Sequence, residues 1–330
     1  MSTPSLSLAV QVERWPIAGS FTISRGAKTE AVVVVAEVSD GHCRGRGECV
    51  PYPRYGETVE GVIAALHGME DPIARGLTRE GLQTAMLPGA ARNALDCALW
   101  DLAAKQARRP AHELAGLDAP HPVTTAFTIS LAEPDIMAAA AARTADRALL
   151  KIKLGGAGDA ARIAAVRRAA PDAELIVDAN EGWNADNLAE NLAACADASV
   201  SLIEQPLRAD DDTALAYVSR PVPVCADESA HGIATLAALV GKYDAVNIKL
   251  DKAGGLTEAL AMAQEAERLG FDIMVGCMVA TSLAMAPAML VAQRARYVDL
   301  DGPLLLRRDR PDGLLYEGSA VYPPTSALWG

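Results

Sequence analysis

Short apolar runs alternate with alanine-rich amphipathic stretches along the chain from His121 onward. This alternation is typical of repeated strand and helix units around a parallel sheet. Eight runs are predicted strands, at residues 123–130, 148–154, 174–180, 200–206, 222–228, 244–250, 272–278 and 297–303. The stretches between them are predicted helices, including 160–169, 184–195 and 256–269. Because a closed sheet leaves no unpaired edge, we expect an α/β fold with a (β/α)8-type, or modified TIM, barrel. An open, doubly wound sheet is the alternative.

The first third of the chain has a different pattern. Strand-like runs at 6–12 and 31–38 are separated by turn-forming and charged residues, among them Gly26 and Lys28. Helical stretches follow at 58–66 and 91–107, and the second carries one apolar stripe, formed by Leu95, Ala98, Leu99 and Leu102. We therefore expect an α+β capping domain over residues 1–118 and a catalytic (β/α) barrel over 119–306. The remaining tail, 307–330, is too short for another unit and is expected to pack on the capping domain.

Composition narrows the class of protein. The length of 330 residues suits a barrel with a smaller domain, and 51% hydrophobic residues suit a large core. A net charge of −12 disfavours nucleic acid and anionic membrane surfaces as partners. The N-terminal segment does not resemble a signal peptide, and the apolar stretch 275–292 is interrupted by polar residues and Pro287, so we expect a cytoplasmic protein. Six scattered cysteines are expected to be reduced.

Charged residues stand at the carboxyl ends of most predicted barrel strands. Active sites of such barrels lie at this end of the strands, where the loops that follow them converge. The residues are Lys151, Lys153, Asp178, Glu204, Asp227, Lys249, Asp299 and Asp301. A set of this kind on successive strands is very improbable as surface decoration, so it is our candidate active site.

Three of these carboxylates, Asp178, Glu204 and Asp227, end three consecutive strands. Unpaired acids brought this close would repel one another and resist ionisation, and a hard divalent cation removes that conflict. Magnesium, or manganese in its place, is the expected ion. The five histidines show no zinc-type spacing.

Two lysines are expected to face each other across the barrel. Lys153 lies on the second strand and Lys249 on the sixth, which are opposite in a ring of eight. Bases on opposite faces of one carbon suit inversion of a stereocentre next to a carboxylate. The metal, helped by Lys151, would stabilise the charge of the resulting enediolate. Asp299 and Asp301, spaced so that both face inward, suit a substrate ammonium, as in a dipeptide.

The motifs at these positions resemble those of the enolase superfamily, and within it the muconate-lactonizing subgroup. They are KIK at 151–153, DAN at 178–180, EQP at 204–206, DES at 227–229 and NIK at 247–249. DLDGP at 299–303 is similar to the DxD motif of dipeptide epimerases, and GECVPYPRYGET with ARNALDCALWDLAAK resembles the L-Ala-D/L-Glu epimerase branch.

The resemblance implies a role for each residue. Asp178, Glu204 and Asp227 would bind one Mg²⁺ per subunit, Lys153 and Lys249 would be the acid and base, and Asp299 and Asp301 would bind the ammonium. Further substrate contacts implied by the resemblance are Thr128, Lys151, Cys277 and Arg25, the last reaching a glutamate side chain from the cap. Lys28 or Arg54 could serve in place of Arg25.

The expected activity is therefore Mg²⁺-dependent 1,1-proton transfer at the α-carbon of the C-terminal residue of a dipeptide. The leading reaction is the conversion of L-Ala-L-Glu to L-Ala-D-Glu, in peptidoglycan peptide metabolism. The rivals are N-acyl amino acid racemase, o-succinylbenzoate synthase and muconate cycloisomerase, whose substrates offer no ammonium to the acid pair. A non-catalytic, anion-binding barrel is a rival from another class. Cys277 stands where mandelate racemases and sugar-acid dehydratases would have a histidine, which disfavours those activities. The sequence is compatible with a homo-oligomer and does not specify the number of subunits.

Overall fold

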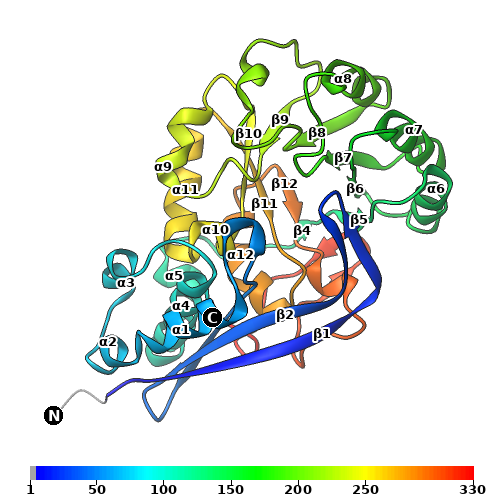
Figure 1. The fold of residues 1–330 in the computed structure, drawn as a ribbon. Helices are drawn as coiled ribbons and strands as arrows, with labels where there is room; N and C mark the ends of the chain where they lie inside the picture. Colours follow the sequence, from blue (N-terminus) through cyan, green and yellow to red (C-terminus); the bar gives the residue numbers. More distant parts are fainter. Residues whose placement is uncertain (1–4) are drawn as a thin grey trace.

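The protein is described by a computed structural model over residues 5–330. The first four residues of the predicted capping domain, which also begin the N-terminal segment discussed above, lie outside the described residues. A ring of strands and helices forms one part of the molecule, and a long hairpin with several helices lies against it (Figure 1). None of the described helices is long and apolar enough to cross a membrane.

Eight parallel strands form the predicted barrel, in the order in which they occur in the chain. They are β5 (Phe127–Ile129), β6 (Leu149–Lys153), β7 (Glu174–Asp178), β8 (Val200–Glu204), β9 (Val224–Ala226), β10 (Ala245–Ile248), β11 (Asp272–Gly276) and β12 (Tyr297–Asp299). The first and last strands approach each other where the Ala126 amide donates to the Val298 carbonyl. The (β/α)8-type barrel is confirmed, and the open doubly wound sheet is excluded.

The first barrel strand is shorter than predicted. Residues 123–130 divide into β4 (Val123–Thr124) and β5, and β4 pairs with β14 (Ala320–Val321) near the end of the chain. Between them, the amide of Thr125 donates to the Ser319 carbonyl, so the backbone leaves the barrel at this point. The apolar pattern could not reveal the break, because both pieces are extended.

Helices cover the outside of the barrel. They are α6 (Pro134–Arg143), α7 (Asp159–Ala169), α8 (Leu188–Asp197), α9 (Ile233–Leu236), α10 (Leu250–Ala253), α11 (Leu256–Arg268) and α12 (Ser282–Ala292), with short 3-10 turns at η2 (Thr213–Ala216), η3 (Ala237–Leu239) and η4 (Gly302–Leu305). Helices α7 and α11 match the predicted ranges, whereas α8 begins four residues later than expected. The Asn184 and Asn187 side chains bind nearby backbone amides and hold a turn there, which competes with the helix.

One apolar layer inside the barrel explains where the charged residues must lie. Each strand region contributes one buried side chain to this layer: Ala126, Leu149, Ile176, Leu202, Cys225, Ala245, Met274 and Tyr297. Side chains two residues apart on a strand point the same way. Two residues beyond the layer come Lys151, Asp178, Glu204, Asp227 and Asp299. The polar site is thus built directly on an apolar floor.

The first third of the chain forms an antiparallel sheet and a group of helices. The elements are β1 (Ser7–Ile23), β2 (Gly26–Ser39), β3 (Arg44–Cys49), the turn η1 (Pro53–Tyr55), α1 (Val59–His67), α2 (Glu70–Ala74), α3 (Arg79–Ala85), α4 (Ala90–Ala107) and α5 (Ala111–Leu114). The prediction of two short strands was wrong in extent, since β1 and β2 continue as one hairpin that turns at residues 24–25. Its polar residues face solvent along the outer side, which broke the apolar pattern. The hairpin tip reaches the mouth of the barrel (Figure 1).

Helix α4 is the centre of the cap. Its predicted stripe of Leu95, Ala98, Leu99 and Leu102 is buried, against β3 and neighbouring helices. Two glycines allow the close approach, because a Cβ on Gly45 or Gly47 would lie only 2.1 Å from a carbonyl oxygen of α4. The helix therefore packs backbone to backbone against the sheet.

The end of the chain contacts the first third. After β13 (Tyr316–Glu317) and β14, the indole of Trp329 donates to the Cys97 carbonyl at 3.0 Å. The guanidinium of Arg46 donates to the Leu328 carbonyl at 2.9 Å. These contacts agree with a tail that packs on the cap, and the division at residues 118 and 306 remains a prediction.

Candidate active site

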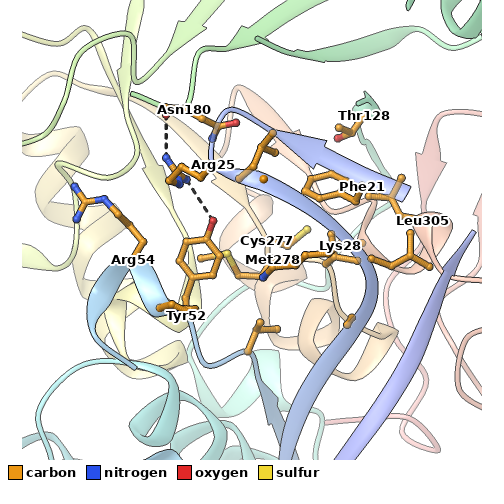
Figure 2. Close-up of a pocket in the computed structure, with 18 of the residues that line it drawn as sticks. Phe21, Arg25, Lys28, Tyr52, Arg54, Thr128, Asn180, Cys277, Met278 and Leu305 are labelled. Atoms are coloured by element: carbon orange, nitrogen blue, oxygen red, sulfur yellow. Dashed lines mark hydrogen bonds between the residues drawn. The ribbon is translucent and has the colours of Figure 1, made fainter. Parts of the chain in front are cut away.

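A cavity of about 570 Å³ lies between the barrel mouth and the cap. Figure 2 shows it bounded by the hairpin, by Tyr52 and Arg54 of the following loop, and by residues at the ends of barrel strands. Eight of the predicted site residues line it: Arg25, Thr128, Lys153, Asp227, Lys249, Cys277, Asp299 and Asp301. The other three, Lys151, Asp178 and Glu204, are buried beneath its surface.

Strand register brings the charged groups together. Lys153 pairs with Asp178 across β6 and β7, and Asp178 pairs with Glu204 across β7 and β8. Asp227 and Lys249 follow the last residues of β9 and β10, two neighbouring strands. Lys153 and Lys249 therefore reach one cavity from strands on opposite sides of the ring.

The lysines and carboxylates form a continuous buried network. Lys153 Nζ lies 2.6 Å from Asp178 Oδ2, and Lys249 Nζ lies 2.7 Å from Asp227 Oδ2. Burial acts to lower the pKa of Lys249, but the charges of Asp227 and Glu204 outweigh it and raise that pKa well above its ordinary value. The neighbouring carboxylates thus favour the ammonium form of Lys249.

Lys151 occupies the centre of the network. Its Nζ lies 2.6 Å from Glu204, 2.7 Å from Asp299 and 3.2 Å from Asp178. Burial is again outweighed by these three carboxylates, so the pKa of Lys151 is raised well above its ordinary value. A permanent positive charge thus lies under the cavity floor, between the acid pair and two of the three predicted metal ligands.

The three predicted metal ligands are not arranged as a ready metal shell. Among residues 5–330, no three acidic, histidine or cysteine side chains are gathered closely enough to enclose an ion. Instead, the ammonium groups of neighbouring lysines lie against the carboxylates of Asp178, Glu204 and Asp227.

The chemistry of the donors nevertheless fits a hard cation. Burial, together with the neighbouring Asp178 charge, raises the pKa of Glu204. Nearby, Asn180 Oδ1 and Glu228 Oε2 are buried with no hydrogen-bond partner in the described part of the chain. Carboxylate and amide oxygens of this kind are the donors that Mg²⁺ prefers.

The acid pair, Asp299 and Asp301, lies at the end of the last barrel strand and also lines the cavity. Asp299 Oδ2 binds Lys151, whereas its Oδ1 is buried with no partner among the described residues. The amide of Thr128 donates to Asp301 Oδ2 at 2.7 Å. Burial and the charge of Asp299 raise the pKa of Asp301 to about 7. An ammonium placed here would relieve both carboxylates.

On the cap side, Arg25 is already fully engaged. Its guanidinium donates to Glu228 Oε1 at 2.7 Å, to the Asn180 carbonyl at 2.9 Å and to the Tyr52 hydroxyl at 3.3 Å. Figure 2 shows Arg25 between Asn180 and Tyr52. The sequence-based role for Arg25, contact with a substrate side chain, therefore competes with contacts inside the protein.

Sequence reasoning missed several residues of the site. Glu228 binds Arg25, and burial together with the charge of Asp227 raises its pKa to about 7. Lys252 is buried on α10, and its Nζ donates to Asp227 Oδ1 at 2.5 Å and to the Asn247 carbonyl at 3.1 Å. Lys252 follows no strand, so the strand-end rule could not find it, but Glu228 directly follows a predicted ligand and could have been found. Tyr52 and Phe21 also line the cavity.

Comparisons with known proteins place this geometry in a family. Residues 136–326 match the model of the enolase C-terminal domain-like family. Residues 5–116 match that of the mandelate racemase / muconate lactonizing enzyme N-terminal domain. The chain belongs to the enolase superfamily. It is an isomerase of the mandelate racemase and muconate lactonizing enzyme group, which confirms the resemblance inferred from the strand-end motifs.

Two curated relatives of this enolase superfamily member cover most of its length. The L-Ala-D/L-Glu epimerase of Escherichia coli K12 is 48% identical over 90% of this chain and 93% of the relative. The N-acetyl-D-glutamate racemase of a Pseudoalteromonas species is 44% identical over 90% and 95%, respectively.

Solved structures agree with these relatives. A superfamily member from Agrobacterium tumefaciens with homology to dipeptide epimerases, solved with sodium and L-Ala-L-Glu, is 59% identical with a TM-score of 0.97, covering 98% of this chain and all of that one. A dipeptide epimerase from Enterococcus faecalis, solved with Mg and L-Leu-L-Tyr, is 29% identical with a TM-score of 0.89, covering 97% of each chain.

Proposed function

We propose that this protein is a magnesium-dependent dipeptide epimerase that interconverts L-Ala-L-Glu and L-Ala-D-Glu. The observation that carries the proposal is the pair of lysines, Lys153 and Lys249, which line one cavity from opposite sides of the strand ring. The epimerase of E. coli and the A. tumefaciens complex with L-Ala-L-Glu support this substrate.

Asp178, Glu204 and Asp227 would hold the magnesium ion, as the complex of the E. faecalis enzyme with Mg supports. When bound, the ion offsets the negative charge that develops on the substrate carboxylate during proton removal. Lys151 would add to this effect from beneath the cavity floor, where its charge is fixed by three carboxylates.

The two lysines would act alternately on the C-terminal α-carbon. One lysine, in its neutral form, takes the proton from one face, and the other, as an ammonium, returns a proton to the opposite face. The roles exchange in the reverse direction. Both lysines line the cavity, and the Nζ atom of each lies beside a carboxylate, that of Lys153 beside Asp178 and that of Lys249 beside Asp227.

Asp299 and Asp301 would bind the free ammonium of the alanine residue. Their buried excess of negative charge supports this role, because a positively charged group satisfies it. The product, a dipeptide ending in D-glutamate, is of the kind found in peptidoglycan, which supports a role in peptidoglycan peptide metabolism.

Racemisation of N-acetylglutamate is the second candidate, favoured by the Pseudoalteromonas relative. It would use the same lysines and metal, but its substrate has no ammonium for the acid pair. The charge at Asp299 and Asp301 therefore favours the dipeptide.

Solvent exchange separates the two functions. The protein is incubated in D₂O with Mg²⁺ and L-Ala-L-Glu, with N-acetyl-L-glutamate, or with a library of L,L-dipeptides, and deuterium is located by mass spectrometry. We expect exchange at the C-terminal α-carbon of L-Ala-L-Glu and its loss with a chelator. Exchange confined to N-acetylglutamate would establish the racemase instead, and none in any substrate would leave a binding protein.

A further inference from the structure

Asp227 differs from the other two predicted metal ligands in how its backbone is held. Asp178 and Glu204 are the last residues of β7 and β8, strands of five residues each, and they are paired with each other in the sheet. Strand β9 has only three residues and ends at Ala226, so Asp227 lies one position beyond the strand. A carboxylate that shares one ion with two others needs a fixed position, and at Asp227 that position must come from contacts other than strand pairing.

The side chain of Gln205 supplies such a contact. Gln205 directly follows Glu204 at the end of β8, which is the neighbour of β9 in the sheet (Figure 1). Its Oε1 accepts the Asp227 amide at 2.8 Å and the Ser229 amide at 3.1 Å. One buried side chain thus connects the backbone segments that carry Glu204 and Asp227.

The other end of the Gln205 amide is anchored as well. Its Nε2 donates to the Leu207 carbonyl at 2.8 Å, to the Tyr243 hydroxyl at 2.9 Å and to Ser229 Oγ at 3.0 Å. The two hydroxyls in turn donate to Asp212 Oδ2, at 2.8 Å from Tyr243 and 2.9 Å from Ser229. The amide is therefore fixed in one orientation, because a flip would set its N–H groups against backbone N–H groups.

The backbone of Gln205 adopts an uncommon conformation. Its φ is +34°, in the left-handed region that residues other than glycine seldom adopt. Strained residues of this kind persist where surrounding contacts enforce them, commonly at functional sites. In this conformation the side chain crosses from the end of β8 to the loop after β9, where it meets Asp227.

Different groups hold the Asp227 carboxylate itself. Lys249 Nζ lies 2.7 Å from Asp227 Oδ2, and Lys252 Nζ lies 2.5 Å from Asp227 Oδ1. These contacts orient the side chain, whereas the contact with Gln205 fixes the backbone from which it projects. The position of Asp227 relative to Glu204 therefore depends on Gln205, whichever cation the carboxylate faces.

We propose that Gln205 is a positioning residue for the divalent cation, which fixes the spacing of Glu204 and Asp227 so that both carboxylates fit one small ion. The inference rests on the proposed function for the assignment of these ligands, and it concerns cation binding rather than the dipeptide. Mg²⁺ demands near-ideal octahedral geometry, whereas Ca²⁺ accepts irregular geometry. The contact should therefore matter more for Mg²⁺ than for Ca²⁺.

The test measures cation binding directly, without dipeptide. Isothermal titration calorimetry gives the Kd for Mg²⁺ and for Ca²⁺ in the wild type and in Gln205→Met, which keeps the side-chain length and removes the amide. Groups that hold a metal ligand in place commonly contribute about 10- to 100-fold in metal affinity. We expect the Kd for Mg²⁺ to rise by about this factor in Gln205→Met, and the Kd for Ca²⁺ to rise less. If the methionine variant does not fold, Gln205→Asn, whose amide is one methylene too short to reach Asp227, gives the same comparison.

Thr257→Val is the matched control for loss of polar contacts inside the protein. The Thr257 hydroxyl donates to Asp96 at 2.7 Å and accepts the Trp100 indole N–H at 2.9 Å, between α11 and α4 and outside the cavity lining. Thermal unfolding should show lower stability in both variants, whereas only Gln205→Met should lose Mg²⁺ affinity. An unchanged Kd for Mg²⁺ in Gln205→Met, or equal losses for Mg²⁺ and Ca²⁺, would overturn the inference.

Failure of this inference and failure of the proposed function give different results. A wild type that binds Mg²⁺ but epimerises no dipeptide would contradict the proposed function, while the comparison with Gln205→Met would still decide the role of Gln205. A wild type that binds neither cation would contradict both, because the proposed function includes the ion.

Discussion

The lysines of the barrel and the lysine of the cap stand in opposite surroundings. Lys153 and Lys249 are buried, and each is held by a carboxylate on a neighbouring strand region. Lys28 is exposed at the cavity edge, on the β1–β2 hairpin, and its Nζ lies 5.1 Å from the centre of the Tyr52 ring. The barrel lysines are thus fixed by strand register and ion pairs, whereas the Lys28 ammonium is held by no carboxylate of residues 5–330. Substitutions in the two regions should therefore have different effects on kcat and KM.

The largest effect is expected from the barrel lysines. Lys153→Ala and Lys249→Ala should each lower epimerisation by about 100- to 10,000-fold, because each removes the proton donor or acceptor on one face. Each variant keeps one lysine, so it should still exchange deuterium into one diastereomer of Ala-Glu without inverting it. The two variants should show opposite preferences between L-Ala-L-Glu and L-Ala-D-Glu, measured by NMR in D₂O.

Circular dichroism and thermal unfolding of both variants control for loss of structure, since each substitution leaves a buried carboxylate with fewer partners. If either variant inverted the dipeptide at the wild-type rate, the two-base mechanism would be wrong.

The sequence predicted the barrel residues of the site better than those of the cap. Lys153, Asp178, Glu204 and Asp299 end strands whose apolar runs fix the register, so their convergence follows from a period of two and from barrel closure. Which ammonium binds which carboxylate could not be predicted, because it depends on rotamers and on distances across strands far apart in the chain.

The cap was less predictable for physical reasons. Half of each hairpin strand faces solvent, so its polar residues resembled a turn around Gly26 and Lys28, and the strands were predicted too short. The contact between Arg25 and Glu228 joins residues 203 positions apart. Nothing in local sequence specifies such a pair, and the partners of Arg25 emerged only from the structure.

A smaller effect on KM is expected from pH, through the acid pair of Asp299 and Asp301. Burial and the charge of Asp299 raise the pKa of Asp301 to about 7, so this carboxyl is largely neutral below pH 7. Ionisation strengthens its attraction for an ammonium, so KM for L-Ala-L-Glu should fall by up to about 10-fold as pH rises from 6 to 7.5. Steady-state kinetics between pH 6 and 7.5 measure this change in KM.

The variant Asp301→Asn separates this carboxyl from other titrating groups. It should raise KM and remove most of the pH dependence of KM between 6 and 7.5. If the wild-type KM did not change over this pH range, or if the pH dependence of KM persisted in Asp301→Asn, the substrate ammonium would be bound by a group other than Asp301.

The smallest effect is expected where the cap touches the barrel through a partly exposed ion pair. Arg54 binds Glu181 through two nitrogens, both at 2.7 Å; the Arg54 side chain is 33% exposed and that of Glu181 is 8% exposed, so solvent reaches the pair from one side. Ion pairs of this kind contribute about 1 kcal/mol or less. Arg54→Ala should therefore raise KM for L-Ala-L-Glu only about 2- to 5-fold, by loosening the loop that carries Tyr52, with kcat and the melting temperature nearly unchanged.

Salt should reveal the origin of this effect. High ionic strength screens an exposed pair, so the KM of the wild type should approach that of Arg54→Ala as NaCl increases. Arg268→Ala is the matched control, because Arg268 makes a similar two-nitrogen pair with Glu265 on α11, outside the cavity, and should leave KM unchanged. A large loss of kcat in Arg54→Ala would mean that the cap positions the reacting groups as well, and the contrast between a catalytic barrel and a recognising cap would then have to be abandoned.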